Sequence, residues 1–348
     1  MSFKVLVSDP LAEDGLDILK KEFQVDVKTD LSADNLVGII GDYDALLVRS
    51  GTEVTARVIE AGSRLRFIGR AGAGVDNIDM AAATRRGIIV ANAPEGNTLA
   101  ATEHTMAMIL LLARNIPQAN SSLKKKEWKR SKFMGVEVNE KTLGIVGLGR
   151  IGREVAKRAN VMGMHCVGYD PFISKEKASQ MGVEALSLEE LFKVADFITV
   201  HTPLINETRH IINASSIATM KDGVRIINCA RGGIIDEKDL YDAIVAGKVA
   251  GAALDVFEEE PPLDSPLLTL EKVITTPHLG ASTVEAQTNV AVSIAKQCIS
   301  VLKGGSAKYT VNAPIIPPEY ADTIEPFAYL AEKMARFLTQ LTPGRLEK

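Results

Sequence analysis

Cysteine is scarce in this sequence: Cys166, Cys229 and Cys298 are its only three among 348 residues. Thiols this few and this scattered exclude a disulfide framework or a zinc framework, and we expect no metal site. Long apolar runs are also missing, because the longest one, residues 106–113, is far shorter than the roughly 20 residues that cross a bilayer. Residues 1–10 lack the apolar core of a signal peptide and are typical of a first strand. We therefore expect a cytoplasmic protein without a membrane partner.

The sequence has no excess of positive charge. Its 40 basic and 44 acidic residues give a formal net charge of −4 at pH 7, which removes the electrostatic case for a nucleic-acid partner. A hydrophobic fraction of 46% with 24% charged residues is ordinary for a folded globular protein and argues against intrinsic disorder. The length predicts roughly two domains.

Short β-rich runs alternate with helical patterns along most of the chain, which predicts the α/β class, with parallel sheets covered by helices. The expected strands are residues 3–8, 45–49, 66–71 and 88–91, and then 143–147, 165–169, 197–200, 224–228, 249–254 and 273–275. The expected long helices are residues 98–120, 281–303 and 324–341, the last one after a proline-rich extended segment at 311–318.

Two of these long helices bracket the second strand series, which indicates a discontinuous arrangement of two lobes. We expect a ligand in the cleft between the lobes. The expected parts are a first segment of a substrate-binding domain in residues 1–97, a nucleotide-binding domain in 98–282, a return segment in 283–316 and a C-terminal helix in 317–348.

A glycine triplet directly follows the predicted strand 143–147 and opens a helical pattern. Gly147 permits a tight turn, Gly149 lets backbone N–H groups approach a pyrophosphate, and Gly152 lets the helix pack closely on the strand. Asp170 ends the next predicted strand, where a carboxylate accepts hydrogen bonds from the adenosine ribose. Because a carboxylate also repels a 2′-phosphate, the pattern favours NAD over NADP.

Three ionisable residues, Arg231, Glu260 and His278, follow predicted strands in the same domain, and the ends of parallel strands meet at one edge of a sheet. A histidine can take the proton of a substrate hydroxyl, and a carboxylate on its far nitrogen fixes the tautomer and favours imidazolium. An arginine binds a substrate carboxylate. Taken singly, the histidine is more simply a surface or hydrogen-bonded core residue, the glutamate part of a solvated acidic turn, and the arginine a charge beside a helix. Together with the glycine triplet, the three residues predict hydride transfer. His201, which ends another predicted strand, is a further candidate beside the nicotinamide.

In these residues and their surroundings, the sequence resembles the D-isomer-specific 2-hydroxyacid dehydrogenases over about residues 1–315. The resemblance implies two doubly wound parallel-sheet domains, a Rossmann-like NAD domain inserted in a flavodoxin-like substrate domain, assembled as a homo-dimer or tetramer. It further implies NAD-linked oxidation of 3-phospho-D-glycerate to 3-phosphooxypyruvate, the first step of L-serine biosynthesis. The segments that carry it are residues 69–77, 147–152, 201–203, 228–233, 253–262 and 277–282.

The family motifs imply a role for each matching residue. Arg231 binds substrate, Glu260 orients His278, and His278 is the acid and base. The implied cofactor contacts are Gly147, Gly149, Arg150, Ile151, Gly152, Asp170, His201, Thr202, Cys229, Ala230, Asp255, Gly280 and Ala281. The implied substrate contacts are Arg49, Ser50, Ala71, Gly72, Ala73, Gly74 and Asn97, with the backbone N–H groups of 71–74 facing the substrate carboxylate.

A phosphorylated substrate needs extra positive charge, for which Arg49 and the basic cluster 128–132 are candidates. Arg130 and Lys132 in that cluster either act across a dimer or form a solvated basic face. Two other functions stay open: a glyoxylate or hydroxypyruvate reductase with the same Arg–Glu–His set, and an NAD-sensing corepressor that binds proteins.

Residues 312–319 resemble the start of an intervening domain that, in longer members of the family, leads to a serine-binding regulatory domain. Because the sequence stops at Lys348, we expect activity without feedback inhibition by serine. We also expect the C-terminal helix either to expose an apolar face or to pack on a neighbour.

Overall fold

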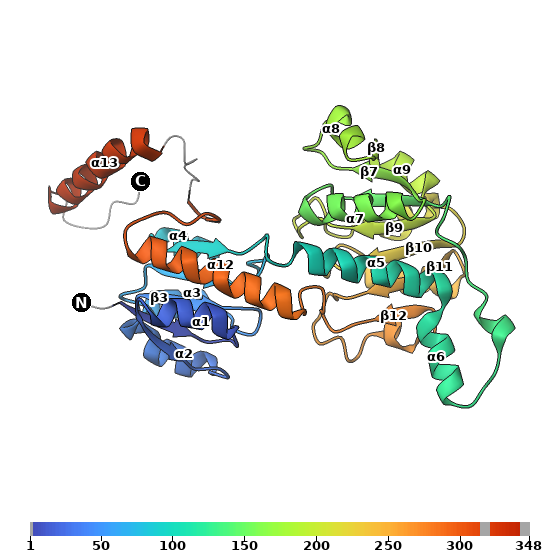
Figure 1. The fold of residues 1–348 in the computed structure, drawn as a ribbon, viewed down its shortest axis with the longest axis horizontal. Coiled ribbons are helices and arrows are strands. Elements are labelled where there is room, and N and C mark those ends of the chain that lie inside the picture. Colours follow the sequence, from blue (N-terminus) through green and yellow to red (C-terminus); the bar gives the residue numbers. More distant parts are fainter. Residues whose placement is uncertain (1–2, 314–320, 342–348) are drawn as a thin grey trace. The chain divides into compact units, whose positions relative to one another are not determined.

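The computed structural model describes residues 3–313 and 321–341 (Figure 1). These residues form two compact units. Unit 1 comprises the chain up to Ala93 together with the residues from Ala291 onward, and unit 2 comprises Pro94–Val290.

Unit 1 is built on a five-stranded parallel sheet in the order β2-β1-β3-β4-β5. This is the flavodoxin-like doubly wound order. Its strands are β1 (Lys4–Val7), β2 (Gln24–Val27), β3 (Ala45–Val48), β4 (Phe67–Arg70) and β5 (Ile89–Asn92). Its helices are α1 (Glu13–Lys20), α2 (Ala33–Ile39), α3 (Ala56–Ala61), α4 (Met80–Arg85) and most of α12 (Val284–Leu302), and α13 (Ala321–Leu341) follows near the C-terminus.

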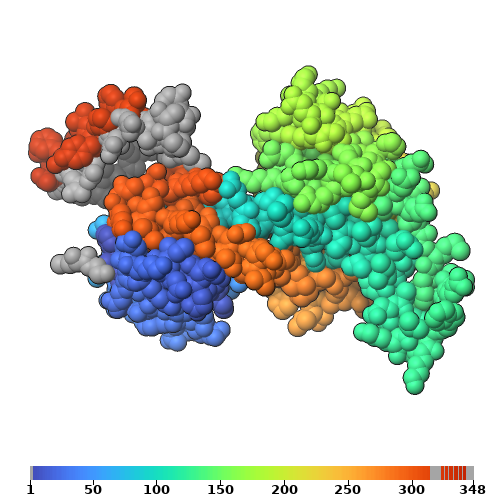
Figure 2. Space-filling model, in the orientation of Figure 1, coloured from blue at the N-terminus to red at the C-terminus, as the bar shows by residue number. Residues whose placement is uncertain are grey.

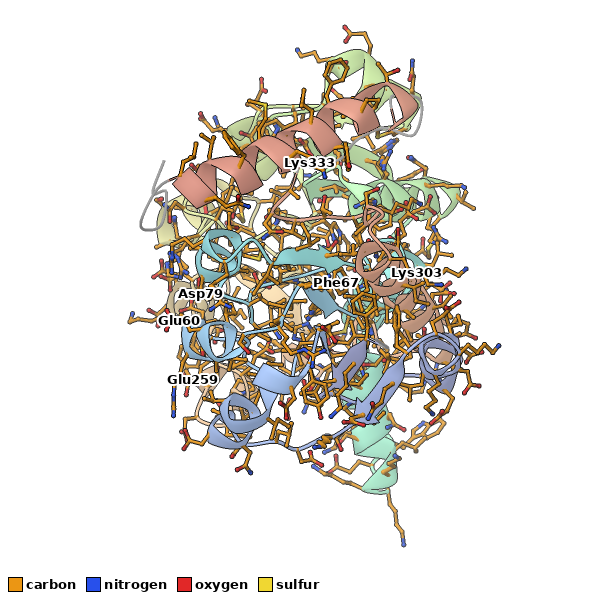
Figure 3. All side chains as sticks on the ribbon, turned by 90° about the vertical axis from the view of Figure 1, so that its left-hand side faces the viewer. Glu60, Phe67, Asp79, Glu259, Lys303 and Lys333 are labelled. Atoms are coloured by element: carbon orange, nitrogen blue, oxygen red, sulfur yellow. The ribbon has the colours of Figure 1, made fainter. Side chains whose placement is uncertain are left out.

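Helix α12 returns from the far end of the sequence to complete the core of unit 1. It packs so closely that a Cβ added to Gly15 would lie 2.8 Å from Ala291, and one added to Gly69 would lie 2.6 Å from Ile294. Figure 1 shows this helix (orange) beside the five-stranded sheet. Phe67, fully buried, lies in the interior of this unit (Figure 3). Gly15 therefore allows α12 to approach α1, and Gly69 of β4 allows it to approach the sheet.

Unit 2 is built on a seven-stranded parallel sheet in the order β12-β11-β10-β9-β6-β7-β8. Counted from β6, this is the Rossmann order 3-2-1-4-5-6 with one strand added. The strands are β6 (Thr142–Val146), β7 (His165–Tyr169), β8 (Glu184–Ala185), β9 (Phe197–Val200), β10 (Val224–Asn228), β11 (Val249–Leu254) and β12 (Val273–Thr275). The helices are α5 (Thr98–Arg114), α6 (Ile116–Lys124), α7 (Arg150–Val161), α8 (Lys175–Gln180), α9 (Leu188–Val194), α10 (Ala214–Thr219) and α11 (Glu237–Val245).

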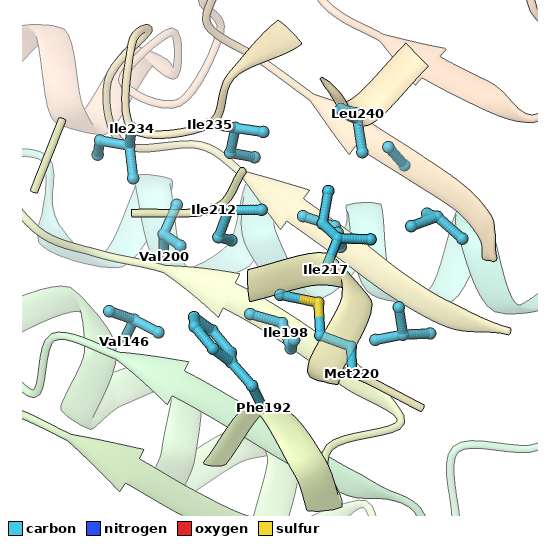
Figure 4. Close-up of a cluster of buried hydrophobic side chains, with 14 of the residues drawn as sticks. Val146, Phe192, Ile198, Val200, Ile212, Ile217, Met220, Ile234, Ile235 and Leu240 are labelled. Carbon is cyan, nitrogen blue, oxygen red and sulfur yellow. The ribbon is translucent and has the colours of Figure 1, made fainter. Parts of the chain in front are cut away.

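The central strands of unit 2 are largely buried because helices cover both faces of a parallel sheet. All four residues of β9 are buried. On one face, Ile198 and Val200 pack with Phe192 of α9 and Ile217 of α10 (Figure 4). This packing fixes the strand ends from which the functional loops leave.

The predicted fold class, two parallel-sheet α/β domains, is confirmed. The single helix predicted over residues 98–120 is wrong: α5 ends at Arg114, Asn115 takes a left-handed conformation (φ 50°), and Pro117 lies in the first turn of α6. The sequence patterns also missed β2, in which no residue is fully buried, and β8, which has two residues. Much of the predicted extended segment at 311–318 lies outside the described residues.

Within the described ranges, none of the helices combines the length and the apolar character that a membrane span requires. The same part of the chain contains no group of three or more His, Cys, Asp or Glu side chains arranged to hold a metal ion.

Truncating a central core residue tests this packing. Ile198 is fully buried, so we expect Ile198→Ala to lower the free energy of unfolding by about 2–5 kcal/mol through lost burial and a residual cavity. The matched control is Ile205→Ala, because Ile205 is 48% exposed, and it should stay within about 0.5 kcal/mol of the wild type. Denaturant unfolding followed by circular dichroism measures both; equal losses would contradict the assigned core.

Candidate active site

The loops that carry Arg231, Glu260 and His278 leave three neighbouring strands, β10, β11 and β12, at their carboxyl ends. Asn228 at the end of β10 is in register with Leu254 of β11, and Leu254 is in register with Thr275 of β12. Since all three strands run parallel, the loops emerge from one edge of the sheet. The sheet order thus gathers residues that are far apart in the sequence.

Glu260 and His278 form a direct pair. His278 Nδ1 lies 2.8 Å from Glu260 Oε2, and the Phe257 N–H donates to Glu260 Oε1 at 3.1 Å. Partial burial raises the pKa of Glu260, but the hydrogen bond and charge of His278 outweigh it and hold this pKa below its ordinary value. A carboxylate only accepts, so Nδ1 carries the hydrogen. The other ring nitrogen, Nε2, is then left to exchange a proton with a substrate.

The loop that carries Arg231 lies against the loop that carries Glu260. A Cβ added to Gly232 would fall 1.7 Å from the Phe257 carbonyl oxygen, so only glycine permits this approach. Asn228 fixes the turn, because its Nδ2 donates to the Arg231 carbonyl at 2.8 Å and its Oδ1 accepts from the Ala230 N–H at 2.9 Å. The guanidinium and the Glu260–His278 pair are therefore carried by loops in contact.

Asp255, expected as a cofactor contact, has a role that the sequence did not reveal. It is fully buried, and its carboxylate accepts hydrogen bonds from Thr276 Oγ1 and from the N–H groups of Leu279 and Gly280, at 2.5, 2.7 and 2.8 Å. Its carbonyl accepts from the His278 N–H at 2.8 Å. Asp255 therefore holds the His278 loop in place through hydrogen bonds on both sides of the histidine.

The glycine triplet forms the turn between β6 and α7. Gly147 has a φ of 96°, and a Cβ on Gly152 would lie 2.0 Å from the Gly147 carbonyl oxygen. A Cβ on Gly149 would meet nothing within 4 Å. The turn is thus tight on its inner side and open at Gly149, next to the N-terminal N–H groups of α7, which favour an anion. Arg150 and Ile151 lie in the first turn of that helix.

Asp170 lies at the end of β7, beside a cavity of about 450 Å³ that Tyr169 and Lys175 also line. Its two carboxylate oxygens accept from the N–H groups of Leu148 and Phe172, both at 2.9 Å. These bonds hold the carboxylate in place while leaving further lone pairs for a ligand's hydroxyl groups.

Two polar side chains follow β9. The Oγ1 of Thr202 is buried and has no hydrogen-bond partner within the described part of the chain. His201 bonds to Thr199 Oγ1 at 3.0 Å, and burial lowers the pKa of His201 to about 4. The orphaned hydroxyl, the open glycine turn and the cavity beside Asp170 together fit a bound dinucleotide.

The other expected cofactor residues lie at the carboxyl edge of the same sheet. Cys229 and Ala230 follow β10, and Gly280 and Ala281 follow His278. Cys229 is buried, which raises the pKa of its thiol to about 12, so the thiol is neutral at pH 7.

The expected substrate residues belong to different units. Arg49 and Ser50 follow β3, and residues 71–74 follow β4, in unit 1; Asn97 precedes α5 in unit 2. Burial lowers the pKa of Arg49, against the opposing effect of Asp9, whose carboxylate accepts from the Arg49 N–H. The Oδ1 of Asn97 is buried without a hydrogen-bond partner among the described residues.

Of the backbone N–H groups in residues 71–74, which we expect to face a substrate carboxylate, two are already hydrogen-bonded within the protein. The Ala71 N–H donates to the Val48 carbonyl at 2.8 Å, and the Gly72 N–H donates to the Arg70 carbonyl at 2.9 Å. The sheet and its turn already use these two donors, which leaves Ala73 and Gly74 as the candidates.

The sequence as a whole is similar to known proteins. Residues 106–280 match the family model described as D-isomer specific 2-hydroxyacid dehydrogenase, NAD binding domain. D-3-phosphoglycerate dehydrogenase of Synechocystis sp. is 53% identical over 345 residues, 99% of this chain and 62% of that protein. The Methanocaldococcus jannaschii enzyme of the same name is 53% identical over 346 residues, 99% of this chain and 66% of that protein.

A solved structure with a similar fold is D-lactate dehydrogenase from Aquifex aeolicus complexed with NAD and lactic acid. It is 29% identical, has a TM-score of 0.81, and the match covers 90% of this chain and all of that one. The present chain spans a little under two thirds of the length of the two phosphoglycerate dehydrogenases that it matches.

The open face of the glycine turn can be filled by mutation. Gly149 has a φ of −67°, which alanine adopts, and its Cβ would meet no protein atom within 4 Å. We expect Gly149→Ala to fold normally but to raise the Kd for NAD at least about 10-fold, because the methyl group occupies the approach to the pyrophosphate. Gly38→Ala in α2, also into open space, is the control. Isothermal titration calorimetry with unchanged NAD affinity in both variants would contradict the assignment.

His201 should make stability depend on pH. Burial places its pKa in the folded chain near 4, below the ordinary 6.5, so the unfolded chain binds more protons between these values and stability falls as the pH is lowered through that window. We expect up to about 2 kcal/mol of this loss between pH 7 and pH 5. Denaturant titrations without NAD should show a smaller loss for His201→Gln; identical losses would contradict the prediction.

Proposed function

Because this chain belongs to the D-isomer-specific 2-hydroxyacid dehydrogenase family, we propose that it oxidises 3-phospho-D-glycerate to 3-phosphooxypyruvate with NAD, the first step of L-serine biosynthesis. The observation that carries the proposal is the 2.8 Å contact between His278 and Glu260 in the unit that contains the NAD-binding domain. The choice of substrate is supported by the 53% identity to two D-3-phosphoglycerate dehydrogenases.

When bound, NAD would supply the acceptor for the hydride that leaves the carbon bearing the hydroxyl group. His278 Nε2 takes the hydroxyl proton, since Nδ1 is engaged by Glu260. The ionised Glu260 stabilises the imidazolium that forms. Arg231 binds the substrate carboxylate and draws electron density toward the oxygen that becomes a carbonyl. In the reverse direction, His278 returns the proton.

Thr202, Asp170 and the turn at residues 147–152 would hold the cofactor. The Thr202 hydroxyl lacks a partner among the described residues, and Asp170 keeps its carboxylate at the edge of the cavity after β7. A carboxylate there accepts ribose hydroxyl groups and repels a 2′-phosphate, which supports NAD over NADP.

We also propose a homo-oligomer in the cytoplasm, where the three free, buried cysteines would stay reduced. Residues 115–136 extend from the rest of unit 2 (Figure 2) and expose large apolar side chains, which favour an interface. Trp128 is 76% exposed and Met134 is 82% exposed. Lys132 already pairs with Glu271 of its own chain at 3.3 Å, so Arg130 is the better candidate to act across such an interface.

Steady-state assays on the purified chain test the activity. We expect NAD reduction with 3-phospho-D-glycerate, with a kcat/KM at least about 10-fold above those for D-glycerate and D-lactate, because the phosphate adds a charged contact. A preference for glyoxylate or hydroxypyruvate with NADPH would favour the reductase function. NAD binding without turnover of any 2-hydroxy acid would favour a binding protein.

Arg49 is the proposed phosphate ligand. We expect Arg49→Ala to raise the KM for 3-phospho-D-glycerate about 10- to 100-fold while changing the KM for D-glycerate little, because one charge-assisted bond is lost only with the phosphorylated substrate. Arg57→Ala is the control, since Arg57 is exposed and pairs with Asp34. Thermal unfolding of both variants checks that folding is intact. Equal losses on both substrates would remove the phosphate-binding role.

A further inference from the structure

His104 lies on α5, far in the sequence from the loop that carries His278, yet its ring contacts the residues that hold that loop. Its Nε2 is 3.1 Å from Thr276 Oγ1 and 3.2 Å from Asp255 Oδ1. The side chain is 19% exposed, and that of Asp255 is 1% exposed. His104 belongs to no sequence motif and does not follow a strand, so its place in the sequence did not indicate that it is part of the site.

The direction of these hydrogen bonds follows from counting hydrogens. The Thr276 hydroxyl has one hydrogen and donates it to Asp255 Oδ1. The carboxylate can only accept, and the hydroxyl oxygen can then only accept from the ring. His104 Nε2 must therefore carry a hydrogen, which it directs toward both oxygens. This holds for the neutral and for the charged ring.

The Asp255 carboxylate depends on its donors because it is buried. Burial raises the pKa of Asp255, but hydrogen bonds from His104, Thr276 and the Leu279 N–H outweigh this and hold the pKa below its ordinary value. A buried carboxylate that loses a donor becomes costly to keep ionised. His104 is the donor that comes from α5, whereas Thr276, Leu279 and Gly280 all belong to the His278 loop.

The loop needs this support because His278 has a backbone conformation that non-glycine residues rarely adopt. Its φ is 54°, in the left-handed region, and such residues persist only where the surroundings hold them. Asp255 bonds to Thr276 before the histidine, to Leu279 and Gly280 after it, and to the His278 N–H itself. The position of the His278 ring therefore depends on the Asp255 carboxylate.

We propose that His104 is a positioning residue for His278, acting through Asp255 and Thr276. The proposal rests on the proposed function, because it assigns His104 to the step in which His278 takes the substrate proton. His104 holds the strained loop so that the ring stays on Glu260 and aligned with the substrate. Its loss should slow turnover without removing a contact to the substrate.

The test compares His104→Leu with His104→Gln. Leucine removes the donor, whereas the glutamine amide nitrogen reaches a position similar to Nε2 and donates. We expect His104→Leu to lower kcat about 10-fold or more, with the KM values for 3-phospho-D-glycerate and NAD and the calorimetric Kd for NAD within about twofold of the wild type. His104→Gln should recover most of the lost kcat. His165→Leu and His165→Gln, at an exposed position of β7, are the controls and should behave as wild type.

A second pair of variants covers the case in which His104→Leu does not fold. Thr276→Val removes the hydroxyl that links the ring to Asp255 and should lower kcat in the same way, whereas Thr276→Ser keeps the hydroxyl and should not. If His104→Leu keeps kcat within about twofold, or if glutamine rescues nothing, the positioning role is refuted while the proposed function stands. A wild-type chain that turns over no 2-hydroxy acid refutes the proposed function itself.

Discussion

The geometry of the candidate site depends on the hydrogen bonds that the buried carboxylate of Asp255 accepts. Asp255 stands at the end of β11, between the two strands whose loops carry Arg231 and His278. A buried charge needs its hydrogen bonds to be satisfied, and Asp255 satisfies them with the backbone and side chain of the His278 loop. The hydrogen bonds that stabilise the Asp255 carboxylate therefore also hold His278 in a left-handed conformation, with its ring against Glu260.

Close backbone approaches shape the rest of unit 2 around this carboxylate. Gly232 lets the Arg231 loop contact the Glu260 loop, and Gly152 lets α7 contact the turn after β6. At each position a single methyl group would overlap a carbonyl oxygen. Gly149 is different, because nothing surrounds it within 4 Å. Of these three glycines, Gly232 and Gly152 allow close contacts within the protein, whereas Gly149 leaves space beside the turn.

The sequence predicted the strands of both sheets well where they are buried along their length, because burial on both faces leaves a strand of mostly apolar residues, as in β9. It failed at β2, an edge strand without such burial, and at Asn115, whose left-handed conformation divides a helical pattern that reads as continuous. The pairing of His278 with Glu260 was predictable from residue types and strand ends. The part played by His104 was not, although its spacing of three from Ala101 and four from Met108, both buried on α5, carried a signal that it faces the interior.

By itself, the sequence determined the class of fold and predicted the tight glycine turn and the candidate side chains of the site, because these follow from hydrophobic periodicity, from glycine and from functional groups at strand ends. Only the tertiary structure decided which donors each group meets. It placed Asp255 in the loop of His278, brought His104 to Thr276 across 172 residues of sequence, and used the N–H groups of Ala71 and Gly72 within the sheet and its turn. A hydrogen bond depends on a distance of a few ångströms between two groups. When the groups belong to segments far apart in the sequence, that distance is set only when the helices and sheets pack together.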